Sequence, residues 1–168
     1  MIKKINLLFL TFFLVGKIKY APGTFASIIT CLLFLLLINF FNLSIIFFIT
    51  LIIFSYSFIA INNSFEEFTS EDPQEIVIDE VVGQMIALLA IPIYETLYPL
   101  PIIYYCVAAF LFFRLFDIFK PYPISYIDSN VKGALGIMLD DIFAGIYAVV
   151  LISIIFFFIG GWVNEILY

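Results

Sequence analysis

Long apolar runs separated by short polar islands make up most of the chain. The first long run extends from Ala26 to Asn62 and is almost wholly apolar. It is too long for one membrane crossing, because about 20 residues suffice to cross a hydrocarbon core of roughly 30 Å. Asparagine and serine interrupt the run near its middle, around Asn42. The pattern therefore predicts a helical hairpin over residues 26–41 and 44–61.

Two shorter apolar segments follow, over residues 81–94 and 102–113. Prolines and Glu95 lie between them, so they predict a second hairpin, which is either partly re-entrant or has its charged ends at headgroup depth. A last apolar stretch, residues 142–163, predicts one more helix. The apolar stretch 5–15 is too short to span a membrane. It predicts a short interfacial or re-entrant helix rather than a cleaved signal peptide, because no small-x-small cleavage site follows it.

Composition turns this pattern into a fold class. Residues of the AVILMFWYC set make up 65% of the 168 residues, charged residues only 12%, and the mean hydropathy is +1.21. A soluble domain of this size, with a usual apolar content of about 45–50%, could not bury so much apolar surface. We therefore predict an all-α integral membrane protein with a single domain over residues 1–168. It has about five membrane-embedded helices, formed by the two hairpins and the C-terminal helix, besides the short N-terminal helix.

Charge and residue types exclude several functions. A net charge of −6 argues against nucleic-acid binding, and the absence of a GxxxxGK[ST] loop leaves nothing to support nucleotide binding. The chain has no histidine, which removes the Ser-His-Asp triad and histidine-ligated zinc. Cys31 and Cys106 each lie inside an apolar segment, so we interpret them as small buried hydrophobic residues and not as a redox pair.

The basic residues predict the orientation in the membrane. All seven lie before the first hairpin or after the second one, and none lies in the proposed outer turns or the C-terminal tail. The positive-inside rule then places the N-terminal segment, residues 62–80 and residues 114–140 together on the cytoplasmic face. The seven are Lys3, Lys4, Lys17, Lys19, Arg114, Lys120 and Lys132.

Five acidic residues border apolar sequence on that same face, in the segments IVIDEVVG, FRLFDIFKP and GIMLDDIFAG. A charged aspartate at the centre of a membrane helix costs about 2.5–3.5 kcal/mol, and less near the helix ends. Five of them from three segments therefore need a shared counter-charge. Ion pairs with the nearby basic residues are one explanation, and coordination of a cation, which we favour, is the other. The five are Asp79, Glu80, Asp117, Asp140 and Asp141.

An oxygen-only ligand set indicates a hard cation, Mg²⁺ before Mn²⁺ or Ca²⁺. Mg²⁺ commonly keeps places for water and phosphate oxygens, which leaves Arg114 and Lys120 to engage a phosphate group. Arg114, Asp117 and Lys120 follow at three-residue spacing, so neighbours in the series share a helix face, and Pro121 is expected to end that helix. We predict Asp117 to be a metal ligand or a general base. The other four acids, Asp79, Glu80, Asp140 and Asp141, are the predicted metal ligands.

A fourth polar island, GKIKYAPGTFAS over residues 16–27, precedes the first hairpin. Pro22 and Gly23 predict a turn, and Thr24 is expected to cap the N-terminus of the first long helix. Backbone N–H groups at that helix start, at Gly23 and Thr24, predict a binding position for a phosphate group. Further along, Gly145 lies four residues after Asp141, which allows a helix or a ligand to approach that acid closely.

In this order, the islands resemble the phosphatidylglycerophosphatase A family. The matching blocks are GKIKYAPGTFAS, IVIDEVVGQ, FFRLFDIFKPYPI and D-x₄-GALGIMLDDIFAG from Asp128. The resemblance implies a membrane-bound, Mg²⁺-dependent phosphatase that removes the terminal phosphate of phosphatidylglycerophosphate to give phosphatidylglycerol. By the family's pattern, the five acids named above match its acidic positions, and Arg114 and Lys120 match its basic ones.

We therefore expect hydrolysis of a lipid phosphate monoester at the cytoplasmic face of a bacterial inner membrane. The expected partners are the phospholipid substrate and membrane lipid, and the oligomeric state stays open. Two other functions compete with this one. A cation or proton transporter would carry acids at mid-helix depth in both halves of a repeat, and no repeat is visible. A phosphatidyltransferase that uses CDP-activated lipid would carry a DG-x₂-AR-x₈-G-x₃-D-x₃-D run, which the sequence lacks.

Overall fold

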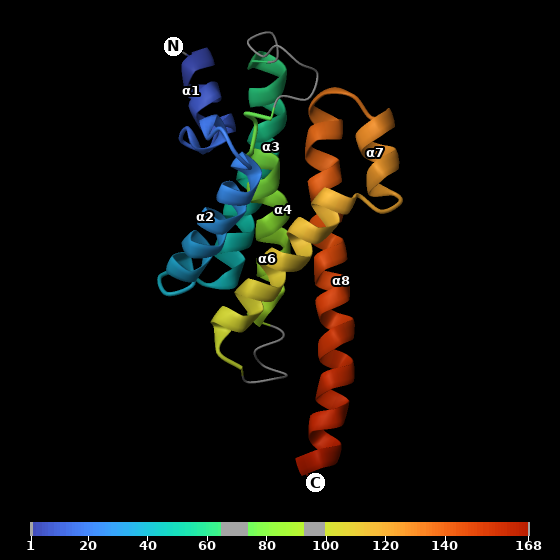
Figure 1. The fold of residues 1–168 in the computed structure, drawn as a ribbon. Helices are drawn as coiled ribbons and strands as arrows, with labels where there is room; N and C mark the ends of the chain where they lie inside the picture. The colour runs from blue at the N-terminus through green and yellow to red at the C-terminus, as the bar shows by residue number, and fades with distance from the viewer. Residues whose placement is uncertain (1, 65–73, 93–99, 168) are drawn as a thin grey trace.

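The computed structural model describes residues 2–64, 74–92 and 100–167, and every regular element in these ranges is helical. Figure 1 shows the helices in chain order, with the termini at opposite ends of the molecule. The predicted all-α fold is confirmed. The bounds are α1 Ile2–Leu10, the 3₁₀ helix η1 Val15–Lys17, α2 Pro22–Leu37, α3 Leu43–Ser64, α4 Ile78–Leu89, α6 Ile102–Phe119, α7 Ile124–Asn130 and α8 Gly133–Leu167.

Three of the described helices are long and apolar enough to cross a membrane, namely α3, α6 and the part of α8 over Gly133–Phe158. Helix α2 is apolar but has 16 residues, and α4 has 12. Both are shorter than the roughly 20 residues that a full crossing needs. The expected count of about five membrane-embedded helices therefore corresponds to three potential spans and two shorter apolar helices.

The first predicted hairpin is present as α2 and α3, which are joined by a tight turn over residues 38–42. The two arms of the second hairpin are α4 and α6. Its turn, including Glu95, lies within residues 93–99 and so outside the described residues. Helix α6 continues six residues beyond the apolar segment 102–113 and ends just before Pro121, as that proline predicted.

The segment 114–140, which we expected on the cytoplasmic face with a helix only up to Pro121, is largely helical. It contains the end of α6, the short helix α7 and the first two turns of α8. Helix α8 begins at Gly133, nine residues before the predicted start at 142. The apolar pattern did not include these turns because they carry acids. In the structure, α4, α6 and α7 all pack against α8. Acids that face other helices rather than lipid avoid the cost of a charge in hydrocarbon, so a helix can extend through them.

Helix α4 lies at the centre of the bundle and packs against α2, α3, α6 and α8. Most of its residues are buried, including Gly83 and Gln84. The two backbones of α4 and α8 approach closely where Gly83 faces Gly145. A Cβ on Gly145 would lie 3.2 Å from the carbonyl carbon of Gly83, and one on Gly83 would lie 2.5 Å from the Asp141 carbonyl oxygen. Gly145 thus serves helix packing beside Asp141.

Helix α1 is tied to the bundle by two polar contacts. The Tyr56 hydroxyl of α3 donates a hydrogen bond of 2.8 Å to the buried Asn6 side chain, and the backbone N–H of Val77 donates one of 3.0 Å to the Leu10 carbonyl. The second bond fixes the chain just before α4 begins. Helix α1 therefore stabilises the segment that leads into the acidic first turn of α4. The predicted short N-terminal helix is present, but it covers Ile2–Leu10 rather than residues 5–15.

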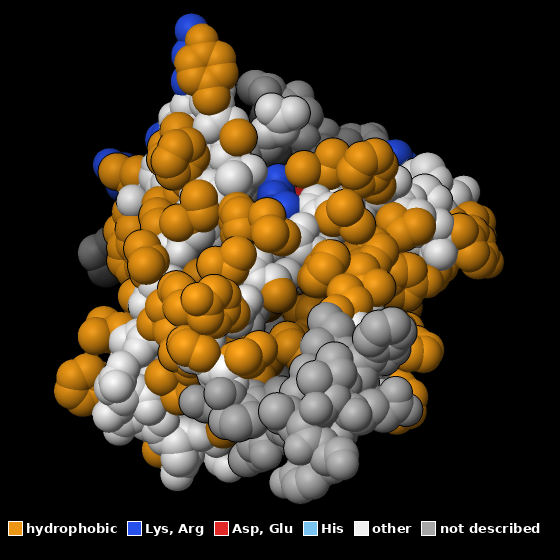
Figure 2. Space-filling view, turned by 60° about the horizontal axis from the view of Figure 1, so that its bottom comes forward, with side chains coloured by type: hydrophobic (Ala, Val, Ile, Leu, Met, Phe, Trp, Pro, Cys, Tyr) orange, Lys and Arg blue, Asp and Glu red, His pale blue; other side chains and the backbone are white. Residues whose placement is uncertain are grey.

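Large apolar side chains face outward on the long helices. Phe48 and Ile52 of α3 are 59% and 68% exposed, and Leu111 of α6 is 57% exposed. Hydrophobic side chains cover most of the face drawn in Figure 2. Such a surface is unfavourable in water and suits contact with lipid tails. The exposed apolar surface agrees with the membrane assignment from composition.

Candidate functional site

The first turn of α4 carries two adjacent carboxylates, Asp79 and Glu80. Acidic side chains are favourable at a helix N-terminus, where unpaired N–H groups give a positive end. The oxygens Asp79 Oδ1 and Glu80 Oε2 are buried and have no hydrogen-bond partner among the residues that the structure describes. Buried, unpaired carboxylate oxygens are costly unless a cation faces them. This turn is thus suited to hold a cation.

Helix α8 brings Asp140 and Asp141 to the same place. One carboxylate oxygen each from Asp79, Glu80 and Asp141 lie within 4.8 Å of one another. We call these three residues the carboxylate trio. Asp140 is turned to a different partner, because its Oδ2 accepts a hydrogen bond of 2.8 Å from Lys120 Nζ. Of the four predicted metal ligands, three therefore form one compact group and Asp140 stands beside it.

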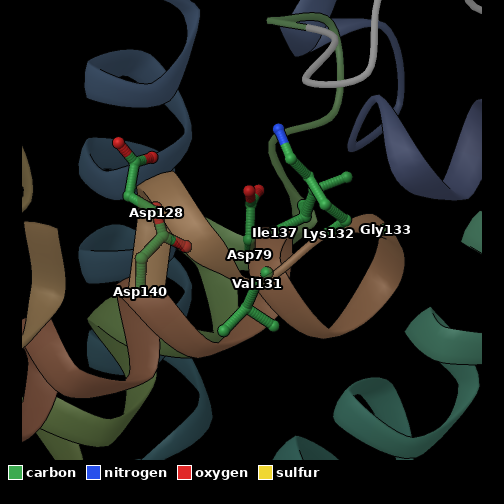
Figure 3. A pocket seen from close by; sticks show the side chains of 8 residues that line it. Asp79, Asp128, Val131, Lys132, Gly133, Ile137 and Asp140 are labelled. Carbon is green, nitrogen blue, oxygen red and sulfur yellow. The ribbon is translucent and has the colours of Figure 1, made fainter. Parts of the chain in front are cut away.

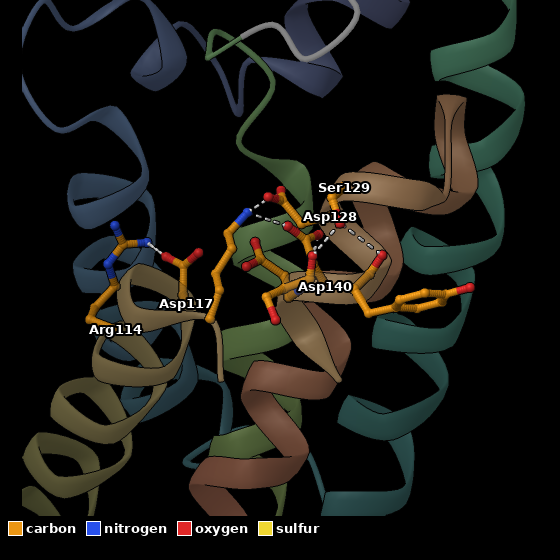
Figure 4. A network of polar contacts seen from close by, with 9 residues as sticks. Arg114, Asp117, Asp128, Ser129 and Asp140 are labelled. Atoms are coloured by element: carbon orange, nitrogen blue, oxygen red, sulfur yellow. Dashed lines mark hydrogen bonds and ion pairs between the residues drawn. The ribbon is translucent and has the colours of Figure 1, made fainter. Parts of the chain in front are cut away.

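The end of α6 supplies the cations. Arg114 forms an ion pair with Asp117 one turn later, and their side chains are only 16% and 15% exposed. Lys120, in a left-handed conformation, caps the helix directly before Pro121, as the sequence predicted for the helix end. Its ammonium group bridges Asp140 and Asp128, which begins the last matching block (Figure 4). The segment FRLFDIFKP thus places two cations beside the acids.

Burial raises the pKa of Asp79 well above its usual range, and the nearby charges of Glu80 and Asp141 raise it further. Burial likewise raises the pKa of Glu80. For Lys120 burial lowers the pKa, but the hydrogen bonds to Asp128 and Asp140 outweigh it, so this pKa lies above its usual value. Lys120 is therefore charged at neutral pH, whereas the raised pKa values of Asp79 and Glu80 mean that their charged forms are disfavoured by burial.

The start of α2 closes the site from another side. A Cβ on Gly23 would lie 2.8 Å from Glu80 Cδ and 3.2 Å from Arg114 Nη1, and closer still to Glu80 Oε1. Gly23 is therefore required for the approach of these two side chains. The prediction that Thr24 caps this helix was wrong. The helix begins at Pro22, with Ala21 as a cap that makes no side-chain hydrogen bond, because proline fits the first helical position without losing a hydrogen bond.

A cavity of about 410 Å³ joins these groups. Its lining comes from the starts of α2 and α4, the end of α6 and the acidic turn of α8, and it includes Gly23 but not Thr24. A second cavity of about 60 Å³ shares Asp79 and Asp140 with the first one, and adds Asp128 and Lys132 (Figure 3). Apart from Thr24, all site residues expected from the sequence therefore line the cavity of about 410 Å³. Besides Gly23 they are Asp79, Glu80, Arg114, Asp117, Lys120, Asp140 and Asp141.

Comparison with known proteins identifies the family to which the chain belongs. The family model described as phosphatidylglycerophosphatase A matches residues 8–156, which is most of the chain. The chain belongs to the phosphatidylglycerophosphatase A family. Membership makes it a phosphatase, and it favours this interpretation over a cation transporter or a CDP-dependent phosphatidyltransferase.

Three relatives within curated proteins carry related names. A phosphatidylglycerophosphatase A of Haemophilus influenzae is 36% identical over 137 residues, covering 82% of this chain and 80% of its own. The Escherichia coli protein of the same name is 41% identical over 75 residues, covering 45% and 40%. A Bacteroides thetaiotaomicron protein with the provisional name phosphatidylinositol-3-phosphatase is 34% identical over 148 residues, covering 86% and 89%. No solved structure matches the chain.

Two polar residues in the phosphatidylglycerophosphatase A blocks were not among the predicted site residues. Asp128 pairs with Lys120 and lines the smaller cavity, and its signal was its position at the head of the last matching block. Gln84 is fully buried one turn after Glu80, and its amide atoms have no hydrogen-bond partner in the described part of the chain. Its signal was a glutamine within the apolar part of the helix that follows Glu80.

Proposed function

We propose that the protein hydrolyses the terminal phosphate monoester of phosphatidylglycerophosphate, giving phosphatidylglycerol and inorganic phosphate, with Mg²⁺ as its cofactor. The observation that carries this proposal is the carboxylate trio, which shares one cavity with Arg114 and Lys120. A phosphate monoester needs both a metal and fixed cations in a site this acidic. The names of the Haemophilus influenzae and Escherichia coli relatives support the same substrate.

The carboxylate trio fits Mg²⁺ by donor type and by its unpaired oxygens. Its donors are oxygens only, which Mg²⁺ prefers. Within the described ranges of the chain, Asp79 Oδ1 and Glu80 Oε2 lack hydrogen-bond partners. In this proposal Asp79, Glu80 and Asp141 hold the ion. When bound, Mg²⁺ supplies Lewis-acid polarisation of the phosphoryl group.

Arg114 and Lys120 supply the charge that binds the phosphoryl oxygens. The Asp117 carboxylate holds the Arg114 guanidinium by an ion pair, and Asp140 and Asp128 hold the Lys120 ammonium. Both cations are thus fixed before the substrate arrives. Fixed donors stabilise charge that develops on the phosphoryl oxygens without reorganising, which is often the largest contribution to catalysis. Asp117 and Asp140 act in this scheme as positioning residues for the two cations.

We also propose that the protein lies in the bacterial inner membrane with the cavity facing the cytoplasm. The described helices α3, α6 and α8 are long enough to cross a membrane. The seven basic residues lie on α1, on η1 and just after it, at the end of α6, and just before α8. The positive-inside rule favours the cytoplasmic side for these segments. The cavity of about 410 Å³ lies beside two of them, the segment just after η1 and the end of α6.

Phosphate release by the purified full-length protein in detergent micelles tests the function. We expect release from phosphatidylglycerophosphate that EDTA stops and added Mg²⁺ restores. A second reaction uses phosphatidylinositol-3-phosphate, the substrate in the name of the Bacteroides thetaiotaomicron relative. A higher kcat/KM for that lipid would overturn the substrate but not the phosphatase chemistry. Release that survives EDTA would overturn the metal, and ion flux into vesicles without any hydrolysis would favour a transporter.

A further inference from the structure

An apolar groove of about 190 Å³ runs between α2 and α6, and no part of the proposed reaction uses it. Its lining contains no polar surface. The two free cysteines of the chain, which the sequence explained only as small hydrophobic residues, face it from the two helices. The residues used in the argument below are Ile28, Cys31 and Leu32 from α2, and Ile103, Val107 and Phe110 from α6.

The groove lies on the same side of α6 as Arg114. Ile103, Val107, Phe110 and Arg114 are spaced by four, three and four residues, so they form one stripe along the helix. The first three line the groove, and Arg114 lines the polar cavity. At 1.5 Å per residue the stripe is about 16 Å long. This length matches half of a hydrocarbon core of roughly 30 Å, which is the depth of one lipid leaflet.

Helix α2 connects the groove with the cavity in the same way. Gly23 at its start lines the polar cavity, and Ile28, Cys31 and Leu32 line the groove about one and a half to two and a half turns further on. Helices α2 and α6 also contact each other directly. In Figure 2, Lys or Arg atoms with Asp or Glu atoms behind them lie recessed between hydrophobic side chains. These charged atoms are therefore bordered by a surface that is itself suited to lipid.

We propose that one acyl chain of the lipid phosphate substrate lies in the groove between α2 and α6 while its phosphate group lies beside Arg114. This inference rests on the proposed function, and it adds where the apolar part of the substrate binds. The two sites match the two parts of a phospholipid. The cavity that contains the cations suits an anionic headgroup, and the uncharged groove next to it along α2 and α6 suits an apolar chain. The substrate then enters sideways from one leaflet and does not leave the membrane.

Photo-cross-linking tests the groove without requiring turnover. The probe is diacyl phosphatidylglycerophosphate with a diazirine in one acyl chain, mixed with the full-length protein in detergent and photolysed on ice. We expect cross-links on residues 28–35 and 103–110, reduced by excess unlabelled diacyl phosphatidylglycerophosphate but not by phosphatidylcholine. Cross-links spread evenly over outward-facing residues such as Phe48 and Ile52, and unaffected by the competitor, would mean bulk lipid and would overturn the proposal.

Two tryptophan variants on α2 test the groove kinetically. Leu32 lines it and Leu33 does not, since successive helical residues point about 100° apart, and both side chains are exposed. We expect Leu32→Trp to lower kcat/KM for the diacyl substrate at least tenfold, mainly through KM, and to change kcat/KM for the deacylated substrate less than twofold. Leu33→Trp should change neither more than twofold. Equal losses of kcat/KM on both substrates in Leu32→Trp would overturn the proposal. Equal kcat/KM values of the wild type for the diacyl and the deacylated substrate would also overturn it.

The two experiments separate this inference from the function on which it rests. Competable cross-links in the groove without phosphate release would keep the lipid site and remove the phosphatidylglycerophosphate phosphatase proposal. Phosphate release with no cross-links in the groove would do the reverse.

Discussion

Replacing Gly23 with alanine tests whether the start of α2 shapes the site. The added Cβ would lie 2.8 Å from Glu80 Cδ, whereas nonbonded carbon atoms normally lie about 3.5–4.0 Å apart. The Glu80 carboxylate, the flexible end of its side chain, must therefore retreat by roughly 1 Å. A misplacement of about 1 Å in a catalytic arrangement can cost on the order of 100-fold in rate, or about 2.7 kcal/mol. We expect Gly23→Ala to lower kcat/KM by about that factor.

Stability should move in the other direction or stay constant. Alanine is favoured over glycine in helices by up to about 1 kcal/mol, and no backbone atom obstructs the new methyl group. The thermal midpoint should therefore not fall. Phosphate release and thermal denaturation of the same preparation measure the two effects, with Phe25→Ala, an outward-facing side chain on the same helix, as the control. Gly23→Ala activity within threefold of wild type would refute the reasoning.

Three further perturbations give distinct results. Lys120→Met should abolish phosphate release and lower the thermal midpoint, because Asp128 and Asp140 lose their shared cation. Burial lowers the pKa of Lys120, but its two hydrogen bonds outweigh burial and hold this pKa above the usual 10.5. The contribution of Lys120 to protein stability should therefore stay constant from about pH 7 to 10 and fall only at higher pH. Thermal denaturation of the wild type and the variant at a series of pH values measures this contribution. Gly145→Ala should lower both activity and stability, the latter by about 1–3 kcal/mol, because its Cβ meets the Gly83 backbone rather than a side-chain end. Removing divalent cations from the wild type should lower the thermal midpoint, by an amount equivalent to about 2.7 kcal/mol relative to Mg²⁺ at 100 times its Kd; an unchanged midpoint would contradict a bound ion.

Most of the helices could be predicted from the sequence, because few backbone conformations other than a helix are stable in lipid. With no water to satisfy the backbone, an apolar run of sufficient length forms a helix, and polar interruptions such as those around Asn42 mark its ends. The errors occurred where protein rather than lipid surrounds the chain. Asp140 and Asp141 were expected at the border of a helix that in fact begins at Gly133, since α4 covers them there.

The candidate site was predicted as a set of residues but not as a geometry. Spacing within FRLFDIFKP placed Arg114 and Asp117 on one helix face, and the structure contains that ion pair. Spacing could not tell that Asp140 turns to Lys120 while Asp141 faces α4, because adjacent helical residues point about 100° apart and the rotation of α8 is set by packing. The same limit hid Asp128, whose partner lies eight residues away across the turn that follows Pro121.

Binding of Mn²⁺ as a spectroscopic substitute for Mg²⁺ tests the central claim most directly. Electron paramagnetic resonance of the purified protein in detergent counts free and bound ion without any need for substrate. We predict that the wild type binds Mn²⁺, that Asp79→Asn and Asp141→Asn lose this binding, and that Glu75→Gln, which removes the same charge from an exposed position before α4, keeps it. Unchanged Mn²⁺ binding in both asparagine variants would contradict the claim that these acids, from two helices, together hold the ion.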